Sequence, residues 1–131
     1  METERKEWPK KTKIITDEHE IKKIIETIKS YPETDYYFSG KYQFSLQARG
    51  IQHDYVMNMF KKFELVKYIE EDTLKFGDTG YDLYYEIKQD FHHLVIGVAL
   101  NKKTGKLDFI HVYDFRKNLQ KYVKIKKSAT N

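Results

Sequence analysis

The sequence predicts an α+β protein in which N-terminal helices pack on a three- to five-stranded antiparallel sheet. Isoleucines at helical spacing follow Asp17. From Phe63 onward, the spacing of apolar residues changes from the helical period to the alternation of strands. Two apolar runs, Leu94–Leu100 and Leu107–Tyr113, are joined by the polar link Asn101–Lys106, which is the signal of a β-hairpin. Helices followed by strands, without alternation, indicate the α+β class.

The 131 residues fit one domain, and a composition of 40% hydrophobic and 34% charged residues is typical of a globular chain. We divide the sequence into a flexible leader at 1–13, a single α+β domain at 14–124 and a basic tail at 125–131, with a last helical turn at Asn118–Lys124. No apolar run approaches the roughly 20 residues that span a bilayer, and the N-terminal residues lack the apolar centre of a secretory signal. We therefore expect a cytoplasmic location and no membrane partner.

The first predicted helix begins after Asp17 and ends at Tyr31. Asp17 is a favourable N-cap, and Glu20 three residues later fits a capping box. Pro32 stops the helix, because the residue before a proline is biased out of helical geometry. The apolar stripe of this helix consists of Ile21, Ile24, Ile25 and Ile28.

The segment Lys41–Arg49 fits two secondary structures. Its apolar residues alternate as in a strand, but a helix that starts at Ser39 would group several of them on one face. Gly50 follows directly and is typical of the left-handed residue that ends a helix, so we favour the helix. A second short helix is predicted next, capped by His53 or Asp54.

Strands are predicted at Phe63–Ile69, at Thr73–Phe76 and at Tyr81–Lys88, and the composition of Gly77–Gly80 indicates a turn. Alternation of apolar and polar residues in Tyr81–Lys88 predicts one buried and one solvated face. The hairpin adds two more strands. Its first strand, Leu94–Leu100, is apolar on both faces and is expected at the centre of the sheet.

Charge is distributed unevenly along the chain. The segment from Glu64 to Asp90 contains eight acidic residues and three lysines. The segment from Asn101 to Asn131 contains nine Lys or Arg and two Asp. Such asymmetry is typical of a nucleic-acid surface or of a surface that docks an acidic partner. A solvated lysine-rich tail accounts for the C-terminal excess equally well.

Several classes of site are not indicated. The chain has no cysteine, which excludes disulfides and thiolate zinc sites. His92 and His93 are adjacent, so on a strand they point to opposite faces and cannot share one ion. There is neither a Gly-rich loop of P-loop spacing nor a serine in a Gly-x-Ser-x-Gly turn. We predict no metal and no cofactor.

The remaining polar residues suit a phosphate ligand. Three of the 24 basic residues are arginines, and each offers phosphate a planar fork that lysine lacks. A metal-independent ribonuclease needs a base for the ribose 2′-hydroxyl, cations for the phosphate and an acid for the leaving oxygen. We predict as catalytic residues His111, Arg116, Arg49 and Tyr113, and as substrate-binding residues Lys88, Lys41 and Tyr85. The alternative is structural: Arg116 pairs with Asp114 or Asp108, and His111 is a surface residue of the sheet.

In the order of its motifs, the chain resembles toxin domains of the RelE superfamily, specifically the BrnT and MqsR relatives and an uncharacterised group close to them. The resemblance covers roughly Ser39–Lys117. It is carried by FSLQARGI, DYVMNMFKKFELVKYIEE, DLYYEI, LVIGVAL and LDFIHVYDFRK. It implies short helices with an Arg-Gly-Ile turn followed by a three- or four-stranded antiparallel sheet.

The resemblance also implies an activity. Such toxins cleave mRNA without a metal, through scattered Lys, Arg, His and Tyr on the sheet, and an acidic antitoxin usually neutralises them. Arg49, His111, Tyr113 and Arg116 match the helix and last-strand positions where functional groups lie. Many members carry a His roughly two helical turns before the glycine of the Arg-Gly-Ile turn, where this chain has Lys41 or Tyr42.

Our first interpretation is therefore a RelE-like RNA-binding domain, which would be an endoribonuclease toxin if it is catalytic. The expected partners are RNA and an acidic antitoxin or other protein. Two alternatives stay open. One is a non-catalytic α+β adaptor that binds a protein through its sheet or its acidic strand region. The other is a basic-tailed nucleic-acid binder without chemistry.

Overall fold

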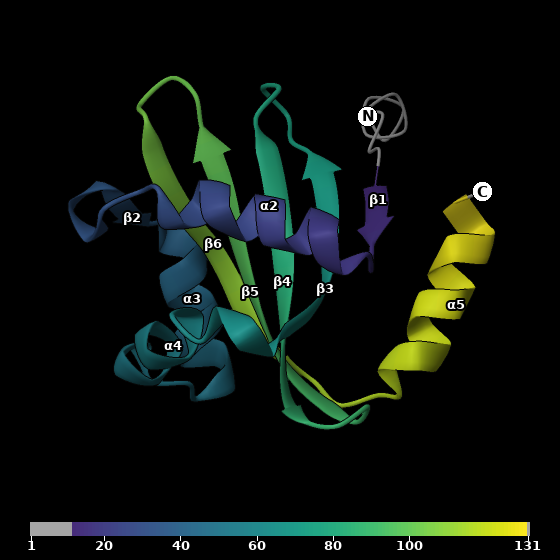
Figure 1. Cartoon of the computed structure of the whole chain (residues 1–131). Coiled ribbons are helices and arrows are strands. Elements are labelled where there is room, and N and C mark those ends of the chain that lie inside the picture. The colour runs from purple at the N-terminus through teal and green to yellow at the C-terminus, as the bar shows by residue number, and fades with distance from the viewer. Residues whose placement is uncertain (1–11, 131) are drawn as a thin grey trace, which may run out of the picture.

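The computed structural model describes residues 12–130 and shows a six-stranded sheet with helices on both faces (Figure 1). The strands are β1 (Thr12–Ile15), β2 (Tyr36–Phe38), β3 (Val66–Thr73), β4 (Thr79–Lys88), β5 (His92–Asn101) and β6 (Lys106–Phe115). The helices are α2 (Glu18–Lys29), α3 (Gly40–Arg49), α4 (His53–Phe60) and α5 (Leu119–Thr130). Short 3₁₀ turns lie at Glu33–Asp35 and Phe63–Leu65.

The α+β class is confirmed, but the predicted strand number and the all-antiparallel sheet are wrong. The strand order is β1-β3-β4-β5-β6-β2, and β2 pairs with β6 in parallel while the other neighbours are antiparallel. Both unpredicted strands are short edge strands. Their partners are distant in the chain, as in Thr12↔Asp72 and Tyr36↔Leu107. Thr12 and Lys13 of the predicted leader belong to β1, and the rest of that leader lies outside the described residues.

The helix boundaries follow from capping. Asp17 accepts a hydrogen bond from the Glu20 amide at 2.9 Å, as predicted for α2. The choice of helix for α3 is confirmed, because Ser39 Oγ accepts from the Tyr42 amide and Gly50 is left-handed with φ 65°. The predicted cap of α4 is wrong: Gln52 occupies the N-cap position and makes no side-chain cap bond.

The main core lies between the sheet and the helices α2, α3 and α4, on what we call the α2 face (Figure 1). β4 and β5 are the two central strands, which confirms the central place predicted for Leu94–Leu100. The apolar stripe of α2 packs onto this face through Ile21, Ile25 and Ile28. Other fully buried members of this core include Tyr42, Phe60, Ile69, Leu83, Tyr85, Leu94, Ile96 and Phe109.

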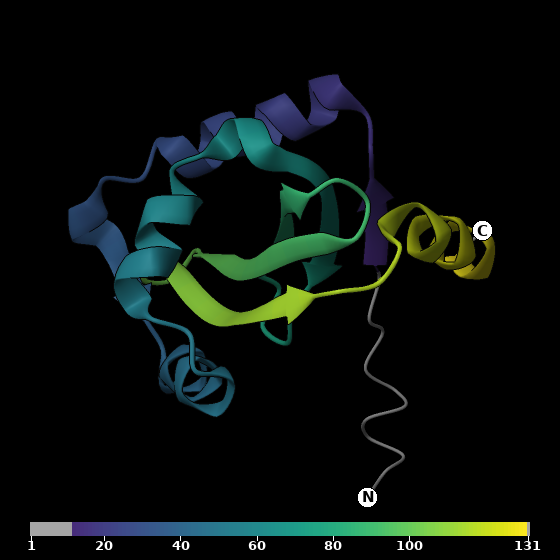
Figure 2. The same cartoon turned by 90° about the horizontal axis from the view of Figure 1, so that it is seen from below.

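A second, smaller core lies on the opposite face under α5, which we call the α5 face. Figure 2 shows α5 at the end of the molecule away from α3 and α4. Its Leu119 packs with Tyr68, Tyr84, Val95 and Phe115. The predicted solvated face of Tyr81–Lys88 is therefore wrong for Tyr84, which is 0% exposed.

The C-terminal residues form a longer helix than predicted. Asn118 caps α5 through its side chain, which accepts from the Lys121 amide at 2.9 Å. The helix then continues to Thr130, so most of the predicted basic tail is helical. Among the described residues, no helix has the length and apolar character needed to cross a bilayer.

Two of the predicted strands differ from the elements in the structure. Phe63–Leu65 is a 3₁₀ turn, and β3 starts at Val66. The predicted strand Thr73–Phe76 is wrong, because Thr73 is the last residue of β3 and the chain then turns into β4. The turn is closed by a 2.8 Å hydrogen bond from the Leu74 amide to the Asp78 carbonyl, with Gly77 left-handed at φ 87°.

Candidate functional site

The α5 face carries a His–Asp pair outside the area that α5 covers. His111 of β6 is in register with Gly97 of β5, which is in register with Asp82 of β4. His111 Nε2 and Asp82 Oδ1 are 2.9 Å apart. The pair thus joins two strands that are not neighbours, over the strand between them.

Gly97 makes this contact possible. A Cβ atom at position 97 would lie 2.5 Å from His111 Nε2 and 2.7 Å from Asp82 Oδ1, closer than real Cβ contacts. Adjacent strands are about 4.8 Å apart, so side chains two strands apart can meet only where the middle strand presents no side chain. Glycine at this position therefore has a packing role.

The hydrogen bond orients the His111 ring. In the neutral imidazole, Nε2–H donates to the Asp82 carboxylate, which leaves the lone pair on Nδ1. Within residues 12–130, Nδ1 has no hydrogen-bond partner, and the side chain is 29% exposed. A carboxylate that orients a histidine and leaves its other nitrogen accessible is the usual arrangement of a general base.

Tyr113 lies beside His111 on the same face, two residues further along β6. The two ring centroids are 5.7 Å apart. Burial raises the pKa of Tyr113 to about 12, while a hydrogen bond with Tyr84 acts in the opposite direction, and the protonated hydroxyl can donate a hydrogen bond. Arg49 reaches over this ring from α3, with its guanidinium carbon 5.8 Å from the Tyr113 centroid.

Helix α3 brings Arg49 to this place because it runs along the edge of β6. β2 covers that edge only at Leu107–Phe109, and beyond it Ser45 Oγ accepts from the Val112 amide at 3.0 Å. Ser45 is buried, so this bond satisfies a strand amide that would otherwise lack a partner. Lys41, Ser45 and Arg49 are spaced four residues apart and lie on one stripe of the helix.

The α3–β6 site therefore consists of Lys41, Arg49, Asp82, His111 and Tyr113. Four of these were predicted from the sequence. Asp82 was missed, since in the sequence it is one polar residue of an alternating strand. The contact of Asp82 with His111 depends on the register of β4, β5 and β6, and local sequence patterns do not specify that register.

A cluster around Glu70 supports the same face next to the site. Glu70 is 7% exposed, and its Oε2 accepts hydrogen bonds from the hydroxyls of Tyr68 at 2.9 Å and Tyr122 at 3.1 Å. Tyr122 belongs to α5, so the carboxylate attaches that helix to the sheet. Burial raises the pKa of Tyr68 far above its ordinary value, and the negative charge of Glu70 is the second largest cause.

Arg116 and Lys88 do not join the α3–β6 site. Arg116 is 67% exposed and lies 4.0 Å from Asp114, which also accepts from His92 Nε2 at 2.9 Å. Five residues along a strand separate Arg116 from His111 by about 16 Å. Lys88 is exposed at the end of β4, in register with His92. Arg116 was predicted as a catalytic residue together with His111, but it lies apart from His111 and beside Asp114, which is a partner that the structural alternative names.

Tyr85 is a core residue. It is 0% exposed on the α2 face, and its hydroxyl donates to the Phe60 carbonyl at 2.7 Å. This placement contradicts the predicted contact of Tyr85 with a substrate. Elsewhere in the described chain, no group of three or more His, Cys, Asp or Glu side chains is arranged to hold a metal ion.

Comparisons with protein-family models, with curated proteins and with solved structures give no match to this chain. The resemblance to the RelE superfamily thus stays a prediction. The function proposed below rests on the residues of the site.

Proposed function

We propose that the α3–β6 site binds single-stranded RNA and cleaves it as a metal-independent ribonuclease of the RelE type. The observation that carries the proposal is the grouping of Arg49, Tyr113 and an oriented His111 on one partly exposed patch of the sheet. These three side chains supply a phosphate ligand, a proton donor and a base.

The chemistry starts at His111. Its Nδ1 takes the proton of a ribose 2′-hydroxyl, and the 2′-oxygen then forms a bond to the adjacent phosphorus. The bond from phosphorus to the 5′-oxygen breaks, and Tyr113 donates a proton to that oxygen. The products are a 2′,3′-cyclic phosphate and a free 5′-hydroxyl. Return of the proton from His111 to Tyr113, through water, restores both side chains.

Arg49 stabilises the negative charge on the phosphate. Its guanidinium can donate two parallel hydrogen bonds to the non-bridging oxygens of the phosphate, and it has no carboxylate partner among the described residues. The negative charge on those oxygens grows during attack, so the same contact is stronger in the transition state than in the ground state. Asp82 keeps the His111 ring in place.

Lys41 extends the positive stripe along α3. Eight residues of helix separate Lys41 from Arg49, or about 12 Å. Both side chains are exposed beside β6, so one RNA strand can contact both. Such contacts release counterions, and binding is expected to weaken steeply as salt is raised. An acidic protein that docks on the same two cations would compete with RNA.

The test is cleavage of a labelled single-stranded RNA in EDTA by the wild type and by His111→Ala and Arg49→Ala. General-base removal is expected to lower the rate about 10²–10⁴-fold. The matched control is His92→Ala, which removes another His–Asp pair of the same 2.9 Å length, on the α2 face.

Two results would overturn the proposal. One is a wild-type protein that leaves every RNA intact, since the chemistry would then be absent even if RNA binds. The other is an equal loss of activity in His92→Ala and His111→Ala, which would mean that the loss comes from the fold.

A further inference from the structure

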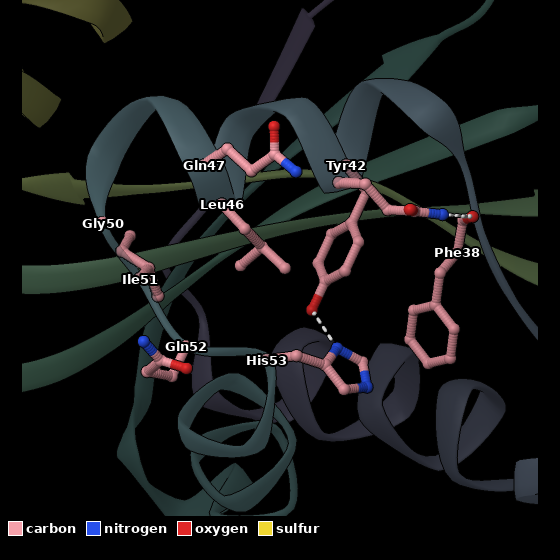
Figure 3. A pocket seen from close by; sticks show the side chains of 9 residues that line it. Phe38, Tyr42, Leu46, Gln47, Gly50, Ile51, Gln52 and His53 are labelled. Carbon is pink, nitrogen blue, oxygen red and sulfur yellow. Dashed lines mark hydrogen bonds between the residues drawn. The ribbon is translucent and has the colours of Figure 1, made fainter.

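A cavity of about 520 Å³ lies on the other side of α3 from the α3–β6 site. Gln43 and Gln47 line it, and each is two residues away from Ser45, which places them on the opposite stripe of the helix. The rest of the wall comes from Tyr42 and Leu46 of α3, from β2, from the connection between α3 and α4, and from His53 at the start of α4 (Figure 3). This volume falls in the range of small-ligand sites.

The lining combines an apolar wall with neutral polar groups. Phe38, Leu46 and Ile51 supply the apolar part, and in the view of Figure 3 Leu46 and Ile51 lie between the side chains of Gln47 and Gln52. None of the lining residues is an acid, a lysine or an arginine. The cavity therefore favours a neutral ligand over a phosphate or a carboxylate, because the wall has no lysine or arginine to balance a buried negative charge.

His53 is hydrogen-bonded to Tyr42 in this cavity. The hydroxyl of Tyr42 is 2.9 Å from His53 Nδ1, as drawn in Figure 3. Tyr42 is 0% exposed, and burial raises its pKa to about 12. The bond occupies Nδ1, so Nε2 is the ring nitrogen left for a ligand, as a donor or an acceptor according to the tautomer. The ring also packs edge-on against Phe38, with centroids 4.7 Å apart.

We propose that this cavity binds one nucleobase of an RNA strand. A base presents donors and acceptors along its edges, which the amides of Gln47 and Gln52 and the ring of His53 can match from different sides of the apolar wall. The face of the base would pack on the apolar wall, as unstacked bases do in RNA-binding sites.

The position of the cavity connects it to the site described above, and in this respect the inference rests on the proposed function. Gly50 lines the cavity and directly follows Arg49. A Cβ at Gly50 would meet nothing within 4 Å, so the surface there is open. A strand whose phosphate is held by Arg49 can therefore pass over Gly50 and place a neighbouring base in the cavity.

The first experiment uses free ribonucleosides, which contain a base and no phosphate. Adenosine, guanosine, cytidine and uridine are titrated into ¹⁵N-labelled protein while the imidazole resonances of His53 are followed. We expect a saturable shift of the His53 signals with at least one nucleoside. Gln47→Ala and Gln52→Ala should each weaken this binding by up to about tenfold, because each removes an amide partner.

The control is Gln89→Ala, which truncates an exposed glutamine outside the cavity and should bind as the wild type does. The inference is overturned if no nucleoside shifts His53, or if both cavity variants bind with unchanged affinity. A shift produced equally by a neutral molecule with no base-like edge, such as benzyl alcohol, would also overturn it, because the cavity would then be a general apolar site.

This test separates the two proposals. His111→Ala should lose RNA cleavage and keep nucleoside binding, whereas Gln52→Ala should change which base is preferred next to the cut. If the protein binds nucleosides but cleaves no RNA, the proposed ribonuclease function is wrong and the nucleobase site stands. If Gln47→Ala and Gln52→Ala cleave RNA with an unchanged base preference, the nucleobase site is wrong and the proposed ribonuclease function stands.

Discussion

Asp82 and His111 are hydrogen-bonded at 2.9 Å although a whole strand lies between the strands that carry them. The second His–Asp pair, His92 with Asp114, instead joins the neighbouring strands β5 and β6. A pair that meets over an intervening strand depends on one position of that strand, which here is Gly97.

Gly97→Ala is expected to break this pair. The new methyl group would lie 2.5 Å from His111 Nε2, so the ring must move and the hydrogen bond to Asp82 is lost. RNA cleavage should fall towards that of His111→Ala, with a loss of about 1–3 kcal/mol in the free energy of unfolding from overpacking. Cleavage and urea unfolding measure both effects. Gly40→Ala is the matched control, since a Cβ there meets nothing within 4 Å. Wild-type activity in Gly97→Ala would contradict the role assigned to the pair.

His93 is expected to make the protein less stable in mild acid. It is 0% exposed, neither ring nitrogen has a hydrogen-bond partner among the described residues, and burial lowers its pKa below the ordinary 6.5. The unfolded chain therefore takes up this proton at a higher pH than the folded protein. The free energy of unfolding should fall as the pH drops below about 6.5, until the lower pKa of the folded state is reached.

His93→Phe tests this effect, because the ring is retained and the titrating group is removed. Urea unfolding at several pH values between 5 and 8 should show a smaller loss of stability in acid for the variant than for the wild type. The variant should also gain stability above pH 7, because an unsatisfied buried polar group costs about 1–3 kcal/mol. Identical pH profiles for the two proteins would show that His93 is not the titrating group.

Glu70→Ala is expected to destabilise the α5 face by about 2–3 kcal/mol, because the hydroxyls of Tyr68 and Tyr122 would lose their shared charged acceptor. Urea unfolding gives the magnitude, and amide exchange in α5 should accelerate. Glu70→Gln keeps an acceptor oxygen and should recover part of the loss. The exposed Glu64→Ala should change stability by less than about 0.5 kcal/mol. Equal losses in the Ala and Gln variants would argue against a hydrogen-bonding role.

Ser45→Ala is expected to loosen the contact between α3 and β6. The Val112 amide would lose its acceptor, at a cost of about 1–3 kcal/mol for a buried donor. Hydrogen exchange at Val112 should become much faster than at Ile96, its cross-strand partner. Ser30→Ala removes an exposed side-chain hydrogen bond at the C-terminal end of α2 and should leave hydrogen exchange at Val112 unchanged. Slow exchange at Val112 in Ser45→Ala would mean that another group protects this amide.

Elements whose formation depends on nearby residues could be predicted from the sequence. The capped start of α2, the end of α3 at Gly50 and the β5–β6 hairpin each depend on residues a few positions apart, and each was predicted. The edge strands β1 and β2 were not, because they contain four and three residues and are held by strands far along the chain. So short a segment shows no period that separates it from a loop.

Which polar residues lie together depends on how the elements pack in three dimensions. In the sequence, Arg49 and Arg116 are equivalent candidates on either side of the sheet-forming segment. The path of α3 along β6 places Arg49 over Tyr113, while Arg116 lies beyond the strand end with Asp114. Sheet register likewise brings Asp82 to His111, since a shift of one residue in a strand would turn its side chains to the other face.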